Sequence, residues 1–456
     1  MGSGSVLKRE PRSTQSRDIM SIHQPQDLGV LRFITAGSVD DGKSTLIGRL
    51  LYDSKAVLSD QLSALSRAKN KRTVGDEIDL SLLTDGLEAE REQGITIDVA
   101  YRYFATAKRK FIIADTPGHE QYTRNMVTGA STAHAAIILV DATRVTFENG
   151  AAQLLPQTKR HSAIVKLLGL QHAIVAINKM DLVDYSETRF NEIRDAYVEL
   201  ARQLGLTDVR FVPVSALKGD NIVTLSERMP WYGGEPLLDL LEALPVEIPT
   251  GQALRFPVQW VARQDGSQAD DFRGYMGRIE AGEVKQGDTI VVLPANREAT
   301  VAEIIAPVPG GTAQVERAFA GQTVTIRLAE DVDVSRGDTF VLREAAPEPA
   351  KKLEADLCWF DDTPLSTQRK YLLKQTTNTV FARIGAIRQV LDVHTLSHAT
   401  DRHDLTMNDI GRVALTLQKP LVCDVYDSHQ GTGAFVLIDE ATHHTVAAGM
   451  IRAFSA

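Results

Sequence analysis

The sequence contains few of the features that mark secreted or membrane proteins. Its two cysteines, Cys358 and Cys423, are too few for a disulfide framework in a chain of 456 residues. No apolar run approaches the roughly 18 residues of a membrane-spanning helix. The first 25 residues have no apolar stretch typical of a signal peptide. These absences predict a cytoplasmic protein that makes no contact with a membrane and whose cysteines are reduced. Because both cysteines lie in apolar, strand-like surroundings, we also expect them to be buried.

The sequence also lacks an excess of positive charge. It carries 50 lysines and arginines against 59 aspartates and glutamates, which gives a net charge of −9. Proteins that bind nucleic acids non-specifically usually present a basic surface, so we do not expect a nucleic-acid partner. The hydrophobic share of 43% is ordinary for a globular protein. The length is sufficient for about two to four domains.

Two kinds of periodicity follow one another along the chain. Between residues 31 and 244, short apolar strands alternate with amphipathic helices, as over 185–204. This pattern predicts an α/β domain with a doubly wound, mostly parallel sheet. After a linker, short strands alternate with Gly-Asp and Gly-Gly turns, which predicts two β-barrel domains. We expect residues 1–25 to be a disordered arm or expression remnant, 26–244 the α/β domain, 245–251 the linker, and 252–348 and 349–456 the barrels.

Residues 37 to 44 match the phosphate-loop pattern GxxxxGK(S/T). Gly37 and Gly42 permit the backbone to approach a phosphate closely at the start of a helix, where the helix dipole favours negative charge. Lys43 is expected to bridge the β- and γ-phosphates, and the hydroxyl of Ser44 to bind Mg²⁺. The alternative, a glycine-rich turn with an incidental lysine, does not explain the strand before it and the helix after it.

Two adjacent carboxylates in this loop are unusual beside phosphates. We expect the side chains of Asp40 and Asp41 to point outward or to hold a cation. No arginine is evident beside the γ-phosphate in the nucleotide motifs, so hydrolysis by the isolated chain is expected to be slow.

The segment Asp115-Thr116-Pro117-Gly118-His119 follows an apolar strand and supplies the candidates for hydrolysis. Asp115 is expected to reach Mg²⁺ through water, and the backbone N–H of Gly118 to bind the γ-phosphate. His119 is placed to orient the attacking water, although isolated histidines are more often structural. Thr96 is the best candidate for a second hydroxyl on Mg²⁺. The charged segment 53–93 before it predicts a mobile switch or, alternatively, a solvated helical insertion.

The choice of base is expected to depend on Asn178-Lys179-Met180-Asp181. Guanine presents N1–H and N2–H₂ on one edge, and the carboxylate of Asp181 can accept both hydrogen bonds. Adenine has an acceptor at N1, so the same carboxylate would lose both. The stem of Lys179 can cover the base, and the backbone N–H of Ala216 can reach guanine O6. These residues predict guanosine triphosphate as the ligand.

Together these segments define the expected nucleotide site. Its GTP-binding residues are Gly37, Ser38, Val39, Asp40, Asp41, Gly42, Lys43, Ser44, Thr45, Asp115, Thr116, Pro117, Gly118, His119, Asn178, Lys179, Met180, Asp181, Ser215, Ala216 and Leu217. Within this set, Lys43, Gly118 and His119 are the expected catalytic residues. The expected cofactors are GTP and Mg²⁺, with the metal held by Ser44 and Thr96 and, through water, by Asp115.

The same residues resemble the translation-factor class of GTPases. The finer sequence resembles one branch, the GTPase large subunits of bacterial heterodimeric sulfate adenylyltransferase (ATP sulfurylase). The resemblance extends from Leu31 to Ile451 and is carried by residues 37–51, 120–126, 215–221, 231–232, 272–275, 408–413 and 432–435. The Asp-Asp pair in the phosphate loop separates this branch from tRNA-delivering factors, which usually carry His or Ser in place of Asp41.

The resemblance implies a GTP-hydrolysing regulatory subunit with a small catalytic subunit as its partner. In that family the small subunit makes adenosine 5′-phosphosulfate and pyrophosphate from ATP and sulfate, and GTP hydrolysis drives the reaction. The alternative is an elongation-factor-like carrier of aminoacyl-tRNA. One departure from the family lies between Phe147 and Leu155, where the chain carries extra residues before Gln157-Thr158-Lys159-Arg160-His161. Contacts with the partner could differ there.

Overall fold

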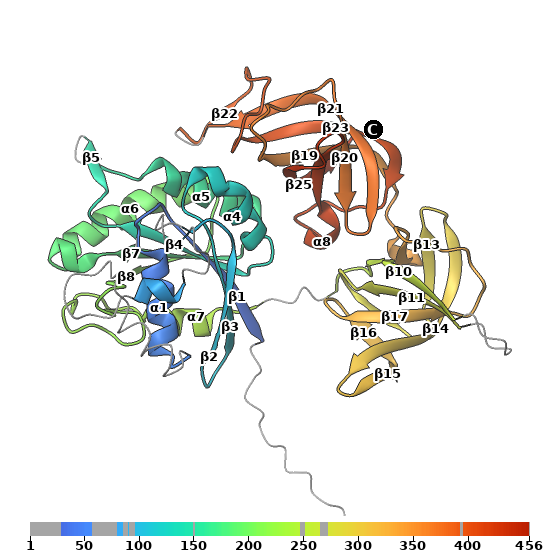
Figure 1. Ribbon diagram of the computed structural model, residues 1–456, viewed down its shortest axis with the longest axis horizontal. Coiled ribbons are helices and arrows are strands. Elements are labelled where there is room, and N and C mark those ends of the chain that lie inside the picture. The colour runs from blue at the N-terminus through green and yellow to red at the C-terminus, as the bar shows by residue number, and fades with distance from the viewer. Residues whose placement is uncertain are drawn as a thin grey trace, which may run out of the picture.

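The computed structural model (Figure 1) describes residues 29–56, 80–84, 90, 96–148, 151–246, 251–264, 272–392 and 395–455. The expected arm at residues 1–25 and most of the expected switch segment 53–93 lie outside the described residues. Within the described ranges, no helix is both long and apolar enough to cross a membrane.

The first domain is built on a six-stranded sheet. Its strands are β1 (Val30–Ala36), β2 (Ala100–Ala105), β3 (Lys110–Asp115), β4 (Ala135–Asp141), β7 (His172–Asn178) and β8 (Val209–Pro213), in the order β2-β3-β1-β4-β7-β8. All neighbours are parallel except the edge strand β2, which is antiparallel to β3. The predicted doubly wound, mostly parallel sheet is therefore confirmed.

Helices cover both faces of this sheet. The helices are α1 (Lys43–Asp53), α4 (Thr123–Ala130), α5 (Pro156–Leu167), α6 (Glu187–Leu204) and α7 (Leu237–Ala243), with short 3-10 helices at Leu80–Leu83 (η1), Glu120–Tyr122 (η2) and Met180–Val183 (η3). Apolar residues of α1 and α7 pack on one face, and those of α4, α5 and α6 pack on the other. Because both faces are covered, every residue of β4 and β7 is buried.

Local signals explain where these elements begin and end. Ser186 caps α6 by accepting a hydrogen bond from the backbone N–H of Arg189, and Gly205 ends the helix in the left-handed conformation. Strand β2 begins only at Ala100. The backbone N–H groups of residues 97 and 98 donate to the side chain of Glu90 instead of to a neighbouring strand.

The second domain is barrel-like and antiparallel. Its main strands are β9 (Phe256–Pro257), β10 (Trp260–Gln264), β11 (Phe272–Arg278), β13 (Thr289–Leu293), β14 (Arg297–Val308), β15 (Gly311–Val315), β17 (Thr323–Leu328) and β18 (Thr339–Leu342). They are ordered β10-β11-β17-β14-β13-β18-β9, with β15 added to β14. The short strands β12 (Glu283–Lys285) and β16 (Arg317–Phe319) form a separate pair, and the 3-10 helix η4 (Arg343–Ala345) follows β18.

The third domain is a closed barrel. Its strands are β19 (Ala350–Trp359), β20 (Lys370–Gln375), β21 (Asn378–Leu391), β22 (His398–Ala399), β23 (Ile410–Leu421), β24 (Ala434–Asp439) and β25 (Thr445–Phe454), with the short helix α8 (Gln430–Gly433). The pairing of β20 with β21 closes a ring of six strands, to which β22 is appended. Cys358 and Cys423 are buried and free, as expected, and burial raises the pKa of each thiol to about 12.

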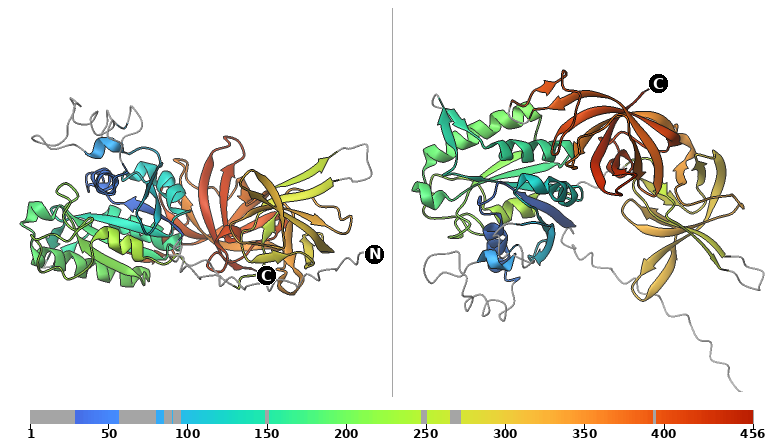
Figure 2. Two further views of the ribbon diagram at one scale, coloured as in Figure 1. Left: turned by 90° about the horizontal axis from the view of Figure 1, so that it is seen from below. Right: turned by 45° about the horizontal axis from the view of Figure 1, so that its top comes forward.

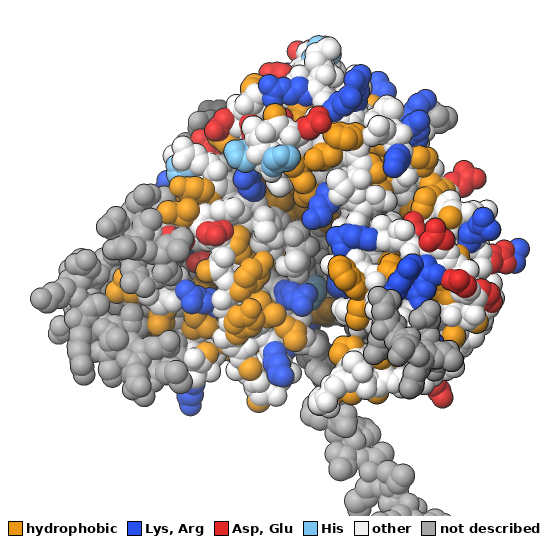
Figure 3. Space-filling view, turned by 45° about the vertical axis from the view of Figure 1, so that its right-hand side comes forward, with side chains coloured by type: hydrophobic (Ala, Val, Ile, Leu, Met, Phe, Trp, Pro, Cys, Tyr) orange, Lys and Arg blue, Asp and Glu red, His pale blue; other side chains and the backbone are white. Residues whose placement is uncertain are grey.

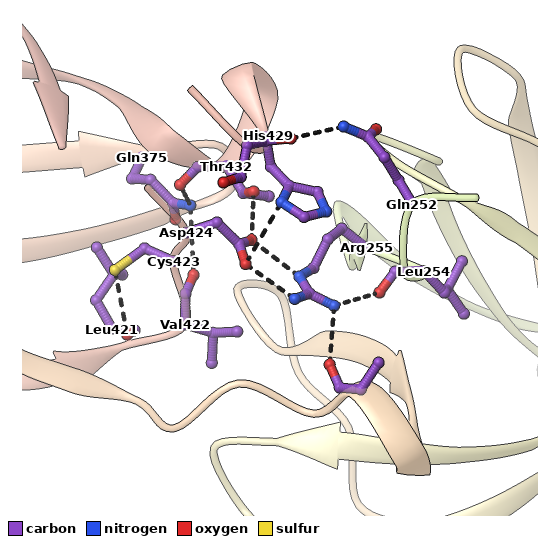
Figure 4. Close-up of polar contacts among 12 residues, drawn as sticks. Gln252, Leu254, Arg255, Gln375, Leu421, Val422, Cys423, Asp424, His429 and Thr432 are labelled. Atoms are coloured by element: carbon purple, nitrogen blue, oxygen red, sulfur yellow. Dashed lines mark hydrogen bonds and ion pairs between the residues drawn. The ribbon is translucent and has the colours of Figure 1, made fainter. Parts of the chain in front are cut away.

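The third domain lies between the other two and contacts both (Figures 1 and 2). Against the second domain, Arg255 forms a two-pronged ion pair with Asp424, with both N–O distances at 2.8 Å, and the hydroxyl of Thr432 donates to the same carboxylate (Figure 4). Against the first domain, the hydroxyl of Tyr426 donates to the carbonyl of Leu168 at 2.9 Å. No hydrogen bond or ion pair between described residues joins the first domain directly to the second.

The inserted residues form a small hairpin on the first domain. Strands β5 (Thr146–Glu148) and β6 (Ala151–Gln153) pair with each other alone, and the guanidinium of Arg189 on α6 stacks on the ring of Phe147 at 4.4 Å. A hollow of about 530 Å³ lies between β6, α5, α6 and Leu396 of the third domain. The nucleotide motifs on either side of the insertion are intact in the sequence, so the expectation of GTP binding is unchanged.

Candidate functional site

The phosphate loop connects the end of β1 to the start of α1. Gly42 is the N-cap of α1 and adopts a left-handed φ of 95°. A Cβ atom added there would lie 2.4 Å from Nδ2 of Asn178, so glycine is required for both conformation and space. The free N–H groups at the start of α1 therefore face the loop, as an anion site requires.

Lys43 is buried at the centre of this loop. Its Nζ donates to the carbonyls of Gly37 at 2.9 Å and Ser38 at 2.8 Å. Burial lowers the pKa of the ammonium, and the carboxylates of Asp41 and Asp115 oppose that shift. A Cβ on Gly118 would lie 2.3 Å from Nζ, so the Asp-Thr-Pro-Gly segment is in close contact with the lysine. The predicted phosphate ligands Lys43 and Gly118 are therefore brought together.

The two loop carboxylates differ in position. Asp40 is exposed, as expected. Asp41 was expected to point outward or to hold a cation, but its side chain is buried and its Oδ2 accepts the backbone N–H of Ser38 at 2.6 Å. This backbone N–H is thereby satisfied by a carboxylate three residues later in the chain. Burial raises the pKa of Asp41 to about 6.

Asp115 ends β3 directly beside the loop and is 1% exposed. Burial raises its pKa to about 6, although Lys43 and the Thr35 hydroxyl, which donates at 3.4 Å, favour the charged form. The hydroxyl of Ser44 lies in the first turn of α1 and is half-buried. A buried carboxylate and a hydroxyl are the hard oxygen donors that Mg²⁺ prefers, so these residues fit that ion. Thr96 is half-buried before β2, and its place on the metal stays a prediction.

His119 is half-buried and is the N-cap of η2. Its Nδ1 accepts the backbone N–H of Gln121 at 3.3 Å, which leaves Nε2 as the ring nitrogen that can meet a water molecule. Its ring centre lies 6.1 Å from that of Tyr122. The part that His119 takes in hydrolysis stays a prediction.

Gln157 at the start of α5 was not predicted as a site residue, although it opens the noted Gln-Thr-Lys-Arg-His run. Its Nε2 donates to the carbonyl of Gly118 at 3.2 Å and lies 3.0 Å from Nε2 of His161. Burial lowers the pKa of His161 to about 3, so its imidazole is neutral and can accept this amide hydrogen. Gly118 is thereby hydrogen-bonded to the start of α5 while it packs closely against Lys43.

Asn178 joins the first and last nucleotide motifs. Its Nδ2 donates to the carbonyl of Asp41 at 2.8 Å, and its Oδ1 accepts the backbone N–H of Ala216 at 2.9 Å. That N–H was assigned to guanine O6, so it can serve the base only by sharing or releasing Asn178. The contact with O6 stays a prediction.

The two charged residues of the base motif, Lys179 and Asp181, follow Asn178 and have different surroundings. Lys179 has a left-handed φ of 64°, and its Nζ forms an ion pair with Asp141 at 2.6 Å. Asp181 is half-buried in the first turn of η3 and makes no hydrogen bond to any other described residue. Its carboxylate is therefore available to the N1–H and N2–H₂ groups of guanine. Met180, by contrast, is fully buried in the core.

Two arginines belong to this site that the motifs did not indicate. Arg49 on α1 donates to the carbonyls of Ala216 at 3.2 Å and of Leu217, and so connects the first helix to the last motif. Arg144 follows β4, and its NH1 donates to the carbonyl of Val39 at 2.6 Å. The carboxyl ends of the parallel strands β1 and β4 meet at one edge of the sheet. A residue just after β4 was therefore a reasonable candidate.

Comparisons with known proteins show the family to which the chain belongs. The family described as the elongation factor Tu GTP binding domain matches residues 29–247, and the GTP-eEF1A C-terminal domain-like family matches residues 352–452. The chain is 47% identical to a protein of Shewanella woodyi, over 96% of this chain and 90% of that protein. It is 49% identical to a protein of Chromobacterium violaceum, over 96% of this chain and 88% of that one. Both relatives are named sulfate adenylyltransferase subunit 1.

Solved structures support the fold. The Ski7 GTPase-like domain of S. cerevisiae, bound to GTP, superposes with a TM-score of 0.51 at 16% identity. The match covers 93% of this chain and 97% of that one. A GTPase domain followed by two barrel-like domains is therefore shown.

Proposed function

The chain belongs to the sulfate adenylyltransferase subunit 1 family, and from this premise we propose how its GTPase activity is used. We propose that GTP hydrolysis in the first domain drives the synthesis of adenosine 5′-phosphosulfate and pyrophosphate from ATP and sulfate. The adenylyl transfer itself takes place on a separate small catalytic subunit. We also propose that the chain acts in the cytoplasm, where its two buried cysteines stay reduced.

The observation that carries the proposal is that residues of the expected nucleotide site lie together, while the sequence contains no other phosphate loop. Lys43, Asp115 and Gly118 meet at the phosphate end, and Asn178 fixes the base motif against them. The sequence contains a single GxxxxGK(S/T) pattern. A chain with one GTP site and no second such loop is suited to regulate an ATP-using reaction and not to perform it alone.

Each residue at the phosphate end has a role in hydrolysis. Lys43 exchanges the loop carbonyls for β- and γ-phosphate oxygens, and the N–H of Gly118 binds the γ-phosphate. His119 orients the attacking water through Nε2. Mg²⁺, when bound by Ser44 and Thr96 and through water by Asp115, supplies positive charge to the phosphates. These residues promote GTP hydrolysis mainly by positioning the water and by stabilising negative charge on the phosphates.

Helix α5 offers a route from the γ-phosphate to the barrels. At its beginning, Gln157 holds the carbonyl of Gly118. Near its end, the carbonyls of Leu167 and Leu168 accept hydrogen bonds from Arg452 and Tyr426 of the third domain. Loss of the γ-phosphate releases Gly118, and a rigid helix can carry that change to the opposite end. We propose that the barrels pass it on to the partner subunit.

The experiment is an assay of adenosine 5′-phosphosulfate formation from ATP and sulfate. We expect no product from the chain alone, and we expect the small subunit both to create the activity and to accelerate GTP hydrolysis. Lys43→Ala should remove the stimulation by GTP while the two subunits stay associated. Product made by the isolated chain would contradict the regulatory role. The relatives' names do not favour the elongation-factor alternative, which would be supported only by stimulation of hydrolysis by ribosomes and aminoacyl-tRNA.

A further inference from the structure

Arg144 reaches the phosphate loop from the turn after β4. In that turn, the backbone N–H and the hydroxyl of Thr143 donate to Oδ1 of Asp141 at 2.8 and 2.6 Å. The turn directs the Arg144 side chain back over the loop, where NH1 donates to the carbonyl of Val39. The same NH1 lies 3.7 Å from Oδ1 of Asp41, which is buried and has no hydrogen-bond partner.

Asp41 creates an electrostatic difficulty for a site that binds a triphosphate. Its carboxylate is buried within the loop that must accept the phosphates, and like charges at short range repel. The charged groups that act on it are Lys43, Arg144 and Asp141, of which only the first two are positive. Lys43 turns to the β- and γ-phosphates when nucleotide binds. The cation left facing Asp41 is then Arg144.

Arg144 is also suited to this task by its geometry. Its side chain is 44% exposed, and NH1 is the only side-chain nitrogen that forms a hydrogen bond or an ion pair with another described residue, so the guanidinium stays hydrated while it covers the loop. A guanidinium is always charged and holds a fixed plane, so it can bind a carbonyl and face a carboxylate at once.

We propose that Arg144 is a positioning residue of the nucleotide site. It fixes the carbonyl of Val39 and compensates the charge of Asp41, so that the loop accepts a polyphosphate. The inference rests on GTP binding in the first domain, but it does not depend on how hydrolysis is used.

The test is a double-mutant cycle on the full chain, with the dissociation constants of GTP and GDP as the readout. Arg144→Gln should raise the dissociation constants of both nucleotides about tenfold, since it removes one charge that acts on the loop. Arg144→Lys keeps the charge without the planar guanidinium and should raise both dissociation constants only about threefold. In an Asp41→Asn background the carboxylate is gone, so Arg144→Gln should then raise the dissociation constants less than about threefold.

Arg194→Gln is the matched control, because Arg194 is 39% exposed and pairs with a carboxylate on α6, away from the loop. It should leave both dissociation constants unchanged. Thermal unfolding without nucleotide separates loss of fold from loss of binding. Unchanged affinity in Arg144→Gln would overturn the proposal, and so would an equal loss in the two backgrounds, because compensation of Asp41 requires coupling. Failure of the wild-type chain to bind GTP would instead refute the proposed function.

Discussion

The burial of Asp41 predicts a specific dependence of stability on pH in the nucleotide-free chain. Burial raises the pKa of this carboxyl from 3.8 to about 6 in the folded state. A shift of about two pKa units corresponds to about 3 kcal/mol. Because the folded pKa is the higher one, the folded chain binds the proton more tightly than the unfolded chain does. The loss of folding stability caused by burying the charged carboxylate is therefore absent below about pH 4, grows as pH rises, and is complete above about pH 7.

Asp41→Asn removes this titration and retains an oxygen that can accept the Ser38 N–H. As pH rises from about 4 to about 8, we expect the free energy of unfolding of the variant to increase by about 3 kcal/mol relative to that of the wild-type chain. In a first domain of this size, that gain should raise the midpoint of thermal unfolding by about 6 to 12 °C at the upper pH. Asp115, whose pKa is also raised to about 6, is present in both proteins and cancels in the difference.

The assay is thermal unfolding of the two proteins side by side across that pH range, without nucleotide or Mg²⁺. The informative quantity is the difference in midpoint at each pH, since a pH-independent offset reports only the exchange of one acceptor for another. Parallel curves would show that Asp41 is not titrated as a buried group and would refute the reasoning. A difference that shrinks as pH rises would contradict its sign.

Three further substitutions test the nucleotide site. Asp181→Asn should weaken GTP binding by about 2 to 4 kcal/mol and shift the preference toward xanthosine triphosphate, because the amide donates where the carboxylate accepted; calorimetry with both nucleotides decides this, and unchanged GTP affinity would count against it. His119→Ala should lower single-turnover hydrolysis by about 10² or more with GTP affinity nearly intact; turnover at the wild-type rate would remove His119 from the mechanism. Gly118→Ala should impair GTP binding, because its Cβ would meet Nζ of Lys43 at 2.3 Å and the carbonyl of Gly37 at 2.6 Å; nucleotide affinity equal to that of the wild type would show that the segment moves away from Lys43 without cost.

The sequence was sufficient for the parts of the molecule that depend on local pattern. The alternation of strands and helices gave the sheet and its helices, and glycine spacing with Lys43 located the loop. Gly42 shows why this works, since the residue that the pattern requires is the one whose Cβ would collide with Asn178. The family was recognised from the same local segments.

What could not be predicted depends on contacts between segments far apart in the chain. Asp41 points inward because a single N–H of Ser38 needs an acceptor, a detail of loop curvature that no pattern encodes. Arg144 and Gln157 contact the motifs from β4 and α5, more than 35 residues from their partners. The N–H of Ala216, predicted to contact the base, donates instead to Asn178, 38 residues away in the chain. Side-chain partners of this kind follow from the packed fold, which the sequence alone does not specify in such detail.

The ion pair between Arg255 and Asp424 has a mechanical consequence for the whole chain. Its two 2.8 Å contacts are buried, and Thr432 satisfies the carboxylate further, so separating the barrels would expose two unpaired charges. Removing one member of such a buried pair typically costs about 3 to 5 kcal/mol. The two barrels are therefore expected to move as one body, which is joined to the first domain at the carbonyls of Leu167 and Leu168 and through a shared apolar cluster. A change at that end of α5 would therefore reach the second domain only through the third.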